Sequence, residues 1–141
     1  MKTYPSTDGK AVFVRLPRGS DLLEGLNEAA RELGIEAGTL QVIGAVSRLA
    51  LGQYDQDAHE YTTHEREGGH ELASGLGNVS LRDGAPFVHL HVVASATDGS
   101  ILAGHLMPGT TVFLAEAYFR RLDGPPPVRS HDEDTGLPAW Q

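Results

Sequence analysis

The chain has 141 residues, of which 40% are hydrophobic, and this suits one domain with a sizeable core better than two domains. It contains no cysteine, which excludes disulfides and thiolate metal sites, and its 11 Lys and Arg against 19 Asp and Glu give a formal charge of −8. This acidic balance opposes nucleic-acid binding, which usually needs a basic surface to neutralise phosphates.

No export or membrane signal is found along the chain. Residues 1–10 (MKTYPSTDGK) lack the apolar stretch of a signal peptide. No later segment approaches the roughly 18 apolar residues that are needed to span a bilayer. We therefore expect a soluble, cytoplasmic protein.

The first predicted elements are a strand and a helix. Residues 11–16 (AVFVRL) alternate apolar and polar side chains, which predicts a strand. Ser20 or Asp21 can then cap a helix that ends at Gly34. The apolar side chains of this helix recur at helical spacing and form one stripe for burial: Leu22, Leu23, Leu26, Ala29, Ala30 and Leu33.

The middle of the chain is rich in strand-forming residues. Residues 39–54 predict two strands, or one long strand bent at a glycine. Residues 59–66 are polar but rich in Thr and Tyr, which favours an edge strand. The two glycines at 68–69 predict a turn before a further strand at 70–81.

The final third predicts a histidine-containing hairpin, a strand and a tail. Residues 110–122 favour a strand because alternate residues separate into two faces, although the good helix formers there make a helix the competing interpretation. Residues 123–141 are polar and proline-rich and predict a tail or loop, with Trp140 as an anchor to the body or to a neighbouring subunit. The whole pattern predicts an α+β fold: one amphipathic helix packed on a mainly antiparallel sheet of roughly seven or eight strands.

Three histidines are predicted to converge in residues 86–113. His89 and His91 stand two apart in an apolar run, so both should project from the same face of a strand. A two-residue loop at 98–99 would place His105 opposite Val92, on the wrong face. A three-residue loop at 97–99, with its glycine in the left-handed conformation, instead places His105 opposite His91.

A metal site is the chemical hypothesis that this convergence supports. Imidazole is a common ligand of zinc and related ions, and three imidazoles leave one coordination position open. The alternative is that His89, His91 and His105 are polar residues on a solvated face or core histidines bonded to the backbone. A divalent metal, with zinc as the expected ion, is the preferred interpretation.

Four other histidines are weaker candidates. His59, His64 and His70 lie near the predicted turn, and His64 and His70 would meet there only if the pairing register allowed it. We expect structural or solvent-exposed roles for these three. His131 lies in the predicted tail and is given no role.

Two further polar residues stand among apolar ones. Glu116 is a candidate to orient a ligand histidine or to act as a base toward metal-bound water, and the alternative is an exposed charge. Asn78 either stabilises a turn or bulge or lines a pocket, and we favour the structural role. No phosphate-binding loop, GxSxG elbow or HExxH pair is present, so the sequence names no catalytic residue beyond Glu116.

Three segments carry a family resemblance: GIEAGTLQVIGAV (34–46), ELASGLGNVSLRDGAPFVHLHVV (71–93) and GHLMPGTTVFLAEAYF (104–119). Together they resemble the PPC (plants and prokaryotes conserved) domain, also catalogued as DUF296. The resemblance covers about residues 8–124 and leaves 125–141 as a polar, proline-rich C-terminal tail. A bacterial single-domain member of this family is the expected class of protein.

The resemblance implies an antiparallel sheet with a packed helix, assembly as a homotrimer, and a metal, often zinc, at His89, His91 and His105. Plant members follow AT-hook segments that bind DNA, and bacterial members often carry a DNA-binding label for that reason. This chain has no AT-hook, and residues 69–72 (GHEL) only loosely match the plant partner-recruiting hexapeptide. DNA therefore enters only as a family label.

The sequence leads to one main hypothesis of function and one alternative. The main hypothesis is a trimeric PPC-domain protein with a three-histidine divalent-metal site, acting as a binding or regulatory module. The alternative is a metal-dependent enzyme that acts on an unidentified small molecule, since three histidines leave a position where a bound water can be activated.

Overall fold

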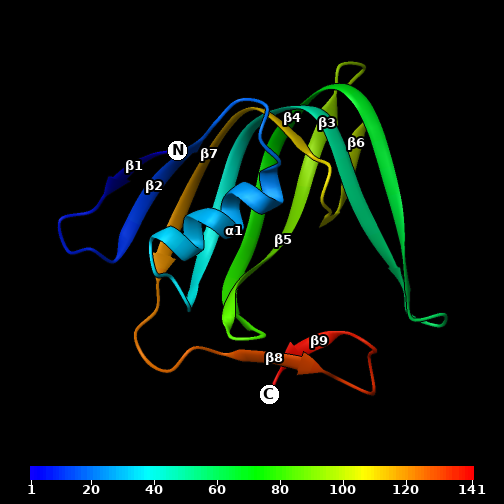
Figure 1. Ribbon diagram of the computed structural model, residues 1–141. Helices are drawn as coiled ribbons and strands as arrows, with labels where there is room; N and C mark the ends of the chain where they lie inside the picture. Colours follow the sequence, from blue (N-terminus) through cyan, green and yellow to red (C-terminus); the bar gives the residue numbers. More distant parts are fainter.

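One helix and nine strands form the fold, and the computed structural model describes all residues, 1–141 (Figure 1). The predicted α+β class with a mainly antiparallel sheet is confirmed. In chain order the elements are β1 (Lys2–Pro5), β2 (Ala11–Leu16), α1 (Leu22–Glu32), β3 (Gly38–Asp55), β4 (Glu60–Arg82), β5 (Ala85–Ala96), β6 (Ile101–Leu106), β7 (Thr111–Arg121), β8 (Val128–His131) and β9 (Pro138–Trp140).

All strands belong to one sheet, in the order β1-β2-β7-β3-β6-β5-β4-β8-β9. The long strand β3 also pairs with β4, so the pairings β3–β4, β4–β5, β5–β6 and β6–β3 form a closed circuit. Every pairing between strands is antiparallel except that of β4 with β8. The closed circuit sets β5 and β6 side by side, which is where the three histidines are found.

The helix α1 covers one face of the sheet, against β2, β5 and β7 (Figure 1). Its buried stripe contains Leu22, Leu26, Ala29 and Ala30, which are fully removed from solvent and join a core of 24 buried apolar residues. Burial of this stripe, at roughly 25 cal/mol per Å² of apolar surface, holds the helix to the sheet. No helix of this structure is long and apolar enough to cross a membrane.

Asp21 begins the helix and also ties it to the sheet. One carboxylate oxygen accepts from the backbone N–H of Glu24 at 2.9 Å, and the other accepts from that of Gly109 at 2.6 Å. The first bond satisfies a free N–H at the helix start, and the second fixes the turn between β6 and β7. Asp21 is therefore the N-cap, as one of the two predicted alternatives, and Gly34 follows the helix with φ +61°.

Strand β3 is one long strand bent at a glycine, which is one of the two alternatives predicted for residues 39–54. Bulges interrupt its pairing between Val42 and Gly44 and again near Val46. A side chain at Gly44 would place a Cβ 2.0 Å from the carbonyl oxygen of Leu114, so only glycine fits. The bend turns the distal half of β3 toward β6.

The predicted turn at residues 68–69 is wrong, because β4 runs through both glycines as one strand of 23 residues. Gly68 adopts φ +94° and absorbs a one-residue shift in the pairing with β3. A glycine pair serves a bulge as well as a turn, since both need the left-handed conformation. Residues 59–66 and 70–81 are thus two halves of one strand.

Other local predictions are confirmed. Residues 110–122 contain the strand β7, not a helix. The three-residue loop at 97–99 is also present, with Ala96 N–H donating to the Ser100 carbonyl oxygen and Gly99 at φ +82°.

The C-terminal segment corrects the prediction of a tail or loop. It folds into the hairpin β8–β9, and β8 adds to the sheet by parallel pairing with Leu81 and Arg82 at the end of β4. These strands have four and three residues, too short to produce a periodic pattern among prolines and acidic residues. With β1, they raise the strand count to nine.

The two bonds of Asp21 generate a stability prediction. We expect Asp21→Ala to lower the free energy of unfolding by about 1–2 kcal/mol, because it leaves two backbone N–H groups without an acceptor. Urea unfolding measures this loss. The control is Asp123→Ala, which removes only the exposed ion pair with Lys10 and should change stability by less than about 1 kcal/mol. Equal unfolding midpoints for wild type and Asp21→Ala would contradict the bridging role.

Candidate metal centre

Strand β5 places His89 and His91 on the face of the sheet that looks away from α1. Val88, Leu90 and Val92 alternate with them and are 1–2% exposed in the core. The helix also holds this strand directly, because the Val88 N–H donates to the side-chain oxygen of Asn27 at 2.9 Å. The alternation that buries the valines therefore projects both imidazoles outward on the same side.

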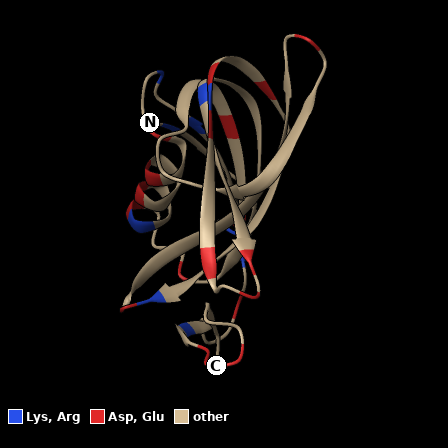
Figure 2. Cartoon of the chain, turned by 90° about the vertical axis from the view of Figure 1, so that its right-hand side faces the viewer, with Lys and Arg blue, Asp and Glu red and all other residues tan.

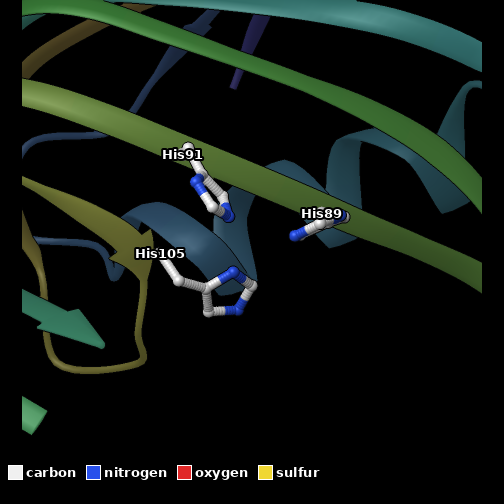
Figure 3. Close-up of side chains that lie close together, drawn as sticks. All are labelled: His89, His91 and His105. Atoms are coloured by element: carbon white, nitrogen blue, oxygen red, sulfur yellow. The ribbon is translucent and has the colours of Figure 1, made fainter. Parts of the chain in front are cut away.

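Strand β6 supplies the third histidine. His105 pairs directly with His91 across the β5–β6 hairpin, as the three-residue loop requires. The ring centroids are 5.1 Å apart for His89–His91, 5.0 Å for His89–His105 and 5.4 Å for His91–His105. Figure 3 shows the three rings turned toward one another, two from β5 and one from β6. The predicted convergence is confirmed.

The chemistry of this cluster fits a metal ion. One ring nitrogen from each histidine lies within 4.8 Å of the other two. Nitrogens bound at about 2.0–2.1 Å to one tetrahedral ion are roughly 3.4 Å apart, so the side chains would have to draw together by up to about 1.4 Å to bind one ion. His105 Nδ1 is also buried without a hydrogen-bond partner. An unpartnered buried nitrogen beside two further imidazoles is an available metal ligand.

The surroundings keep two of the imidazoles neutral. Burial, followed by electrostatic interactions with His105, Arg129 and His91 that oppose a further positive charge, lowers the pKa of His89 to about 4. Burial, followed by His91 and Arg129, also lowers the pKa of His105. Neutral imidazole is the form that binds metals, so the fold holds these rings ready near pH 7.

Two residues that the sequence did not reveal complete the surroundings. The ring of Tyr61, from the β3–β4 hairpin, lies 5.3 Å from that of His105 between centroids. Arg129 Nη2 donates to Asn78 Oδ1 at 3.0 Å and lies 3.4 Å from His89 Nδ1. Asn78 faces His89 across the β4–β5 pairing, so it positions Arg129 beside the cluster.

The other sequence candidates lie apart from this cluster. His59 occupies the tip of the β3–β4 hairpin with φ +55°, and His64 is exposed further along β4. His70 is buried, with Nδ1 2.9 Å from the Gly68 carbonyl oxygen. His131 is exposed, 3.6 Å from Glu133. These positions fit the structural or solvent-exposed roles expected for His59, His64 and His70.

Glu116 lies in a different part of the sheet. It is exposed on β7, opposite Ile43 of β3 and Arg15 of β2. His105 pairs with Gly52, nine residues beyond Ile43 along β3, a path of roughly 30 Å at about 3.3 Å per residue. Glu116 instead lines an open surface hollow of about 500 Å³ between β2, β3 and β7. The fold of one chain therefore does not bring Glu116 to the histidines.

Comparison with known families decides the relationship of this protein. Residues 4–123 match the family model of the Plants and Prokaryotes Conserved (PCC) domain, which is the PPC domain named above. The chain belongs to this family. Its histidine cluster thus lies within the shared PCC domain, whereas Arg129 follows it. No curated protein sequence matches the chain.

Solved structures share the fold over nearly the whole chain. A metal-containing protein from Archaeoglobus fulgidus is 40% identical with a TM-score of 0.89, and the match covers 94% of each chain. A PCC-family protein from Pyrococcus horikoshii is 34% identical, with a TM-score of 0.89 over 94% of this chain and 92% of that one. A protein from Bacteroides thetaiotaomicron with a provisional DNA-binding assignment is 24% identical, with a TM-score of 0.89 over 99% and 96%.

The lowered pKa of His89 predicts how the metal-free protein responds to acid. As pH falls below about 6.5, His89 binds a proton in the unfolded chain, whereas in the folded chain it does so only near pH 4. The free energy of unfolding therefore falls across this pH window. We expect this group to remove about 2 kcal/mol between about pH 7.5 and about pH 5. Urea unfolding in the presence of a chelator measures the loss.

Comparison with His89→Gln isolates the contribution of this group from other titrations. The variant should lose about 2 kcal/mol less than the wild type over the same pH interval. An equal loss in both proteins would show that His89 is not held neutral by the fold.

Proposed function

We propose that this protein is a metal-binding module in which His89, His91 and His105 together hold one divalent cation. The observation that carries the proposal is the convergence of three imidazole nitrogens within 4.8 Å on two paired strands. The lowered pKa of His89 and of His105 supports it, since both rings are neutral near pH 7. The metal-containing relative at 40% identity supports it independently.

Zinc is the ion that we propose for this site. The cluster contains only imidazoles, and no Asp or Glu belongs to it. Calcium and magnesium prefer oxygen ligands, whereas imidazole suits zinc and neighbouring transition metals. A bound zinc with three protein ligands would offer a fourth position, polarised by the ion, to an incoming ligand atom.

A binding or regulatory role is favoured over the enzymatic alternative. Hydrolytic metal sites commonly place a base near the metal-bound water. The cluster has no carboxylate, and Glu116 lies far along the sheet. The residues present therefore support capture of a ligand at the metal more than its chemical conversion.

DNA binding is not proposed. The chain carries a formal charge of −8, and in the view of Figure 2 the Lys and Arg positions are scattered along the chain together with Asp and Glu positions. Such a surface repels phosphate backbones. The 24% identity to the Bacteroides protein extends to the fold alone.

We also propose that the protein is a homotrimer, as the family resemblance implies. The face of the sheet away from α1 exposes large apolar side chains that alternate with buried ones on β2, β3, β4 and β5. Phe13, Ile43 and Leu76 are 58%, 55% and 59% exposed, and Val93 is 39% exposed. An apolar face of this kind is typical of a surface covered by a partner, here by further copies of the chain.

Removal of the ligands tests the metal proposal. After zinc loading and desalting, we expect about one zinc per wild-type chain and a negligible amount in His89→Ala/His91→Ala, because one imidazole alone binds weakly. Elemental analysis measures the content. The matched control is His64→Ala/His131→Ala, which removes two exposed histidines and should keep the wild-type content. Negligible zinc in the wild type would refute the proposal.

Light scattering coupled to size exclusion tests the assembly. The wild type should have three times the 15.1 kDa chain mass. Ile43→Glu should dissociate the trimer, because a buried charge without a partner is costly. Leu122→Glu, at an exposed apolar residue beyond β7, should leave the mass unchanged. A monomeric wild type would contradict the trimer.

A further inference from the structure

Arg129 reaches the histidine cluster from the C-terminal hairpin, beyond residues 4–123 that match the PCC family. Besides the bonds of Arg129 itself, two contacts hold its hairpin, β8–β9, to the body. One is the parallel pairing of β8 with the end of β4, and the other is Tyr54, whose hydroxyl donates to the Thr135 carbonyl oxygen at 2.7 Å. The position of Arg129 beside the cluster is therefore built into the fold.

Neutral acceptors hold the guanidinium of Arg129 in one orientation. Nε donates to Ser80 Oγ at 2.9 Å, Nη1 to the Pro138 carbonyl oxygen at 2.9 Å, and Nη2 to Asn78 Oδ1 at 3.0 Å. The ring of Trp140 lies 5.3 Å from the guanidinium carbon. Three bonds and a stacked ring restrain a side chain that is otherwise among the most flexible.

No carboxylate neutralises this charge. The ion pairs of the chain involve Lys10, Arg48, Arg82 and His131, and none includes Arg129. The side chain is nonetheless half-buried, and burial lowers its pKa. A restrained, partly desolvated cation with only neutral partners is a binding element for an anion.

Metal binding would release one donor of Arg129. A guanidinium can only donate, so its 3.4 Å contact with His89 Nδ1 requires a free lone pair on that nitrogen. A neutral imidazole that binds a metal through one nitrogen carries its proton on the other, so Nδ1 of a metal-bound His89 has no lone pair to offer Arg129. The released Nη2–H would then be free to donate to another acceptor beside the histidine cluster.

We infer that the metal and Arg129 together form a recognition site for a small oxyanion, either a phosphate or a carboxylate group. One oxygen of the anion occupies the open coordination position, and a second accepts from Arg129. The anion also balances the positive charges of the metal and the guanidinium, which repel each other without it. This inference rests on the proposed metal site and adds the chemical class of its ligand.

Cobalt(II) in place of zinc gives a direct readout, because the visible absorption of the ion changes with its coordination. We expect inorganic phosphate to shift the spectrum of the cobalt-loaded wild type in a saturable way. Arg129→Ala should weaken the apparent phosphate affinity by about tenfold or more while keeping its cobalt content. Arg82→Ala, which removes a neighbouring exposed arginine, should weaken it by less than about twofold.

Two further measurements guard against indirect effects. Arg129→Gln keeps a hydrogen-bond donor for Asn78 but removes the charge. It should bind phosphate as weakly as Arg129→Ala does. If Arg129→Ala loses cobalt, Arg129→Gln is the variant that tests the role of the charge. Isothermal titration of the metal-free wild type with phosphate should show at least about tenfold weaker binding than that of the loaded protein. Titration with acetate distinguishes the two oxyanion classes. The class that Arg129 recognises is the one whose affinity falls more in the Arg129 variants.

The outcomes separate this inference from the metal proposal. Normal cobalt uptake with equal phosphate and acetate affinities in wild type and both Arg129 variants would overturn the oxyanion site and leave the metal site intact. No spectral response of the loaded wild type to either anion would also overturn it. Failure of the wild type to take up cobalt or zinc would overturn both proposals.

Discussion

The two-residue period of β5 is the constraint on which the rest of the structure depends. The strand must bury Val88, Leu90 and Val92 under α1, and the same alternation then forces His89 and His91 to the opposite face. A shift of one residue in its pairing would bury the imidazoles and expose the core. The free energy of core packing therefore also holds the register of the candidate metal ligands.

The part of the site that follows from local rules could be predicted from the sequence. Alternation places His89 and His91, and the left-handed conformation of Gly99 sets the loop that brings in His105. The helix followed from the spacing of its leucines and from a capping residue at its start. These features depend on residues close together in the chain, where backbone geometry allows few alternatives.

The features that escaped prediction depend on long-range pairing. Gly68 and Gly69 suit a turn as well as a bulge, and only the partner strand β3 decides between them. Arg129 is 40 residues from His89 in sequence, and its segment is short, polar and proline-rich. Glu116 was a candidate that the fold places elsewhere. The distance of this carboxylate from the histidines cannot be predicted until the order of the strands in the sheet is known.

The candidate site combines partial burial of His89 and His105 with a nearby positive charge. Burial disfavours protonated imidazole, and the nearby guanidinium disfavours it further, which leaves nitrogen lone pairs available. Arg129 adds a fixed charge that cannot be removed near neutral pH. The same surroundings that favour a neutral ligand set for a cation thus also favour the approach of an anion from solvent.

The order of the chain has an evolutionary consequence. Every buried residue lies at or before Phe119, so the hairpin that carries Arg129 contributes nothing to the core. Substitutions in this hairpin are released from the packing constraints that restrict β5 and β6. Arg129 can therefore change without disturbing the core packing that fixes His89, His91 and His105.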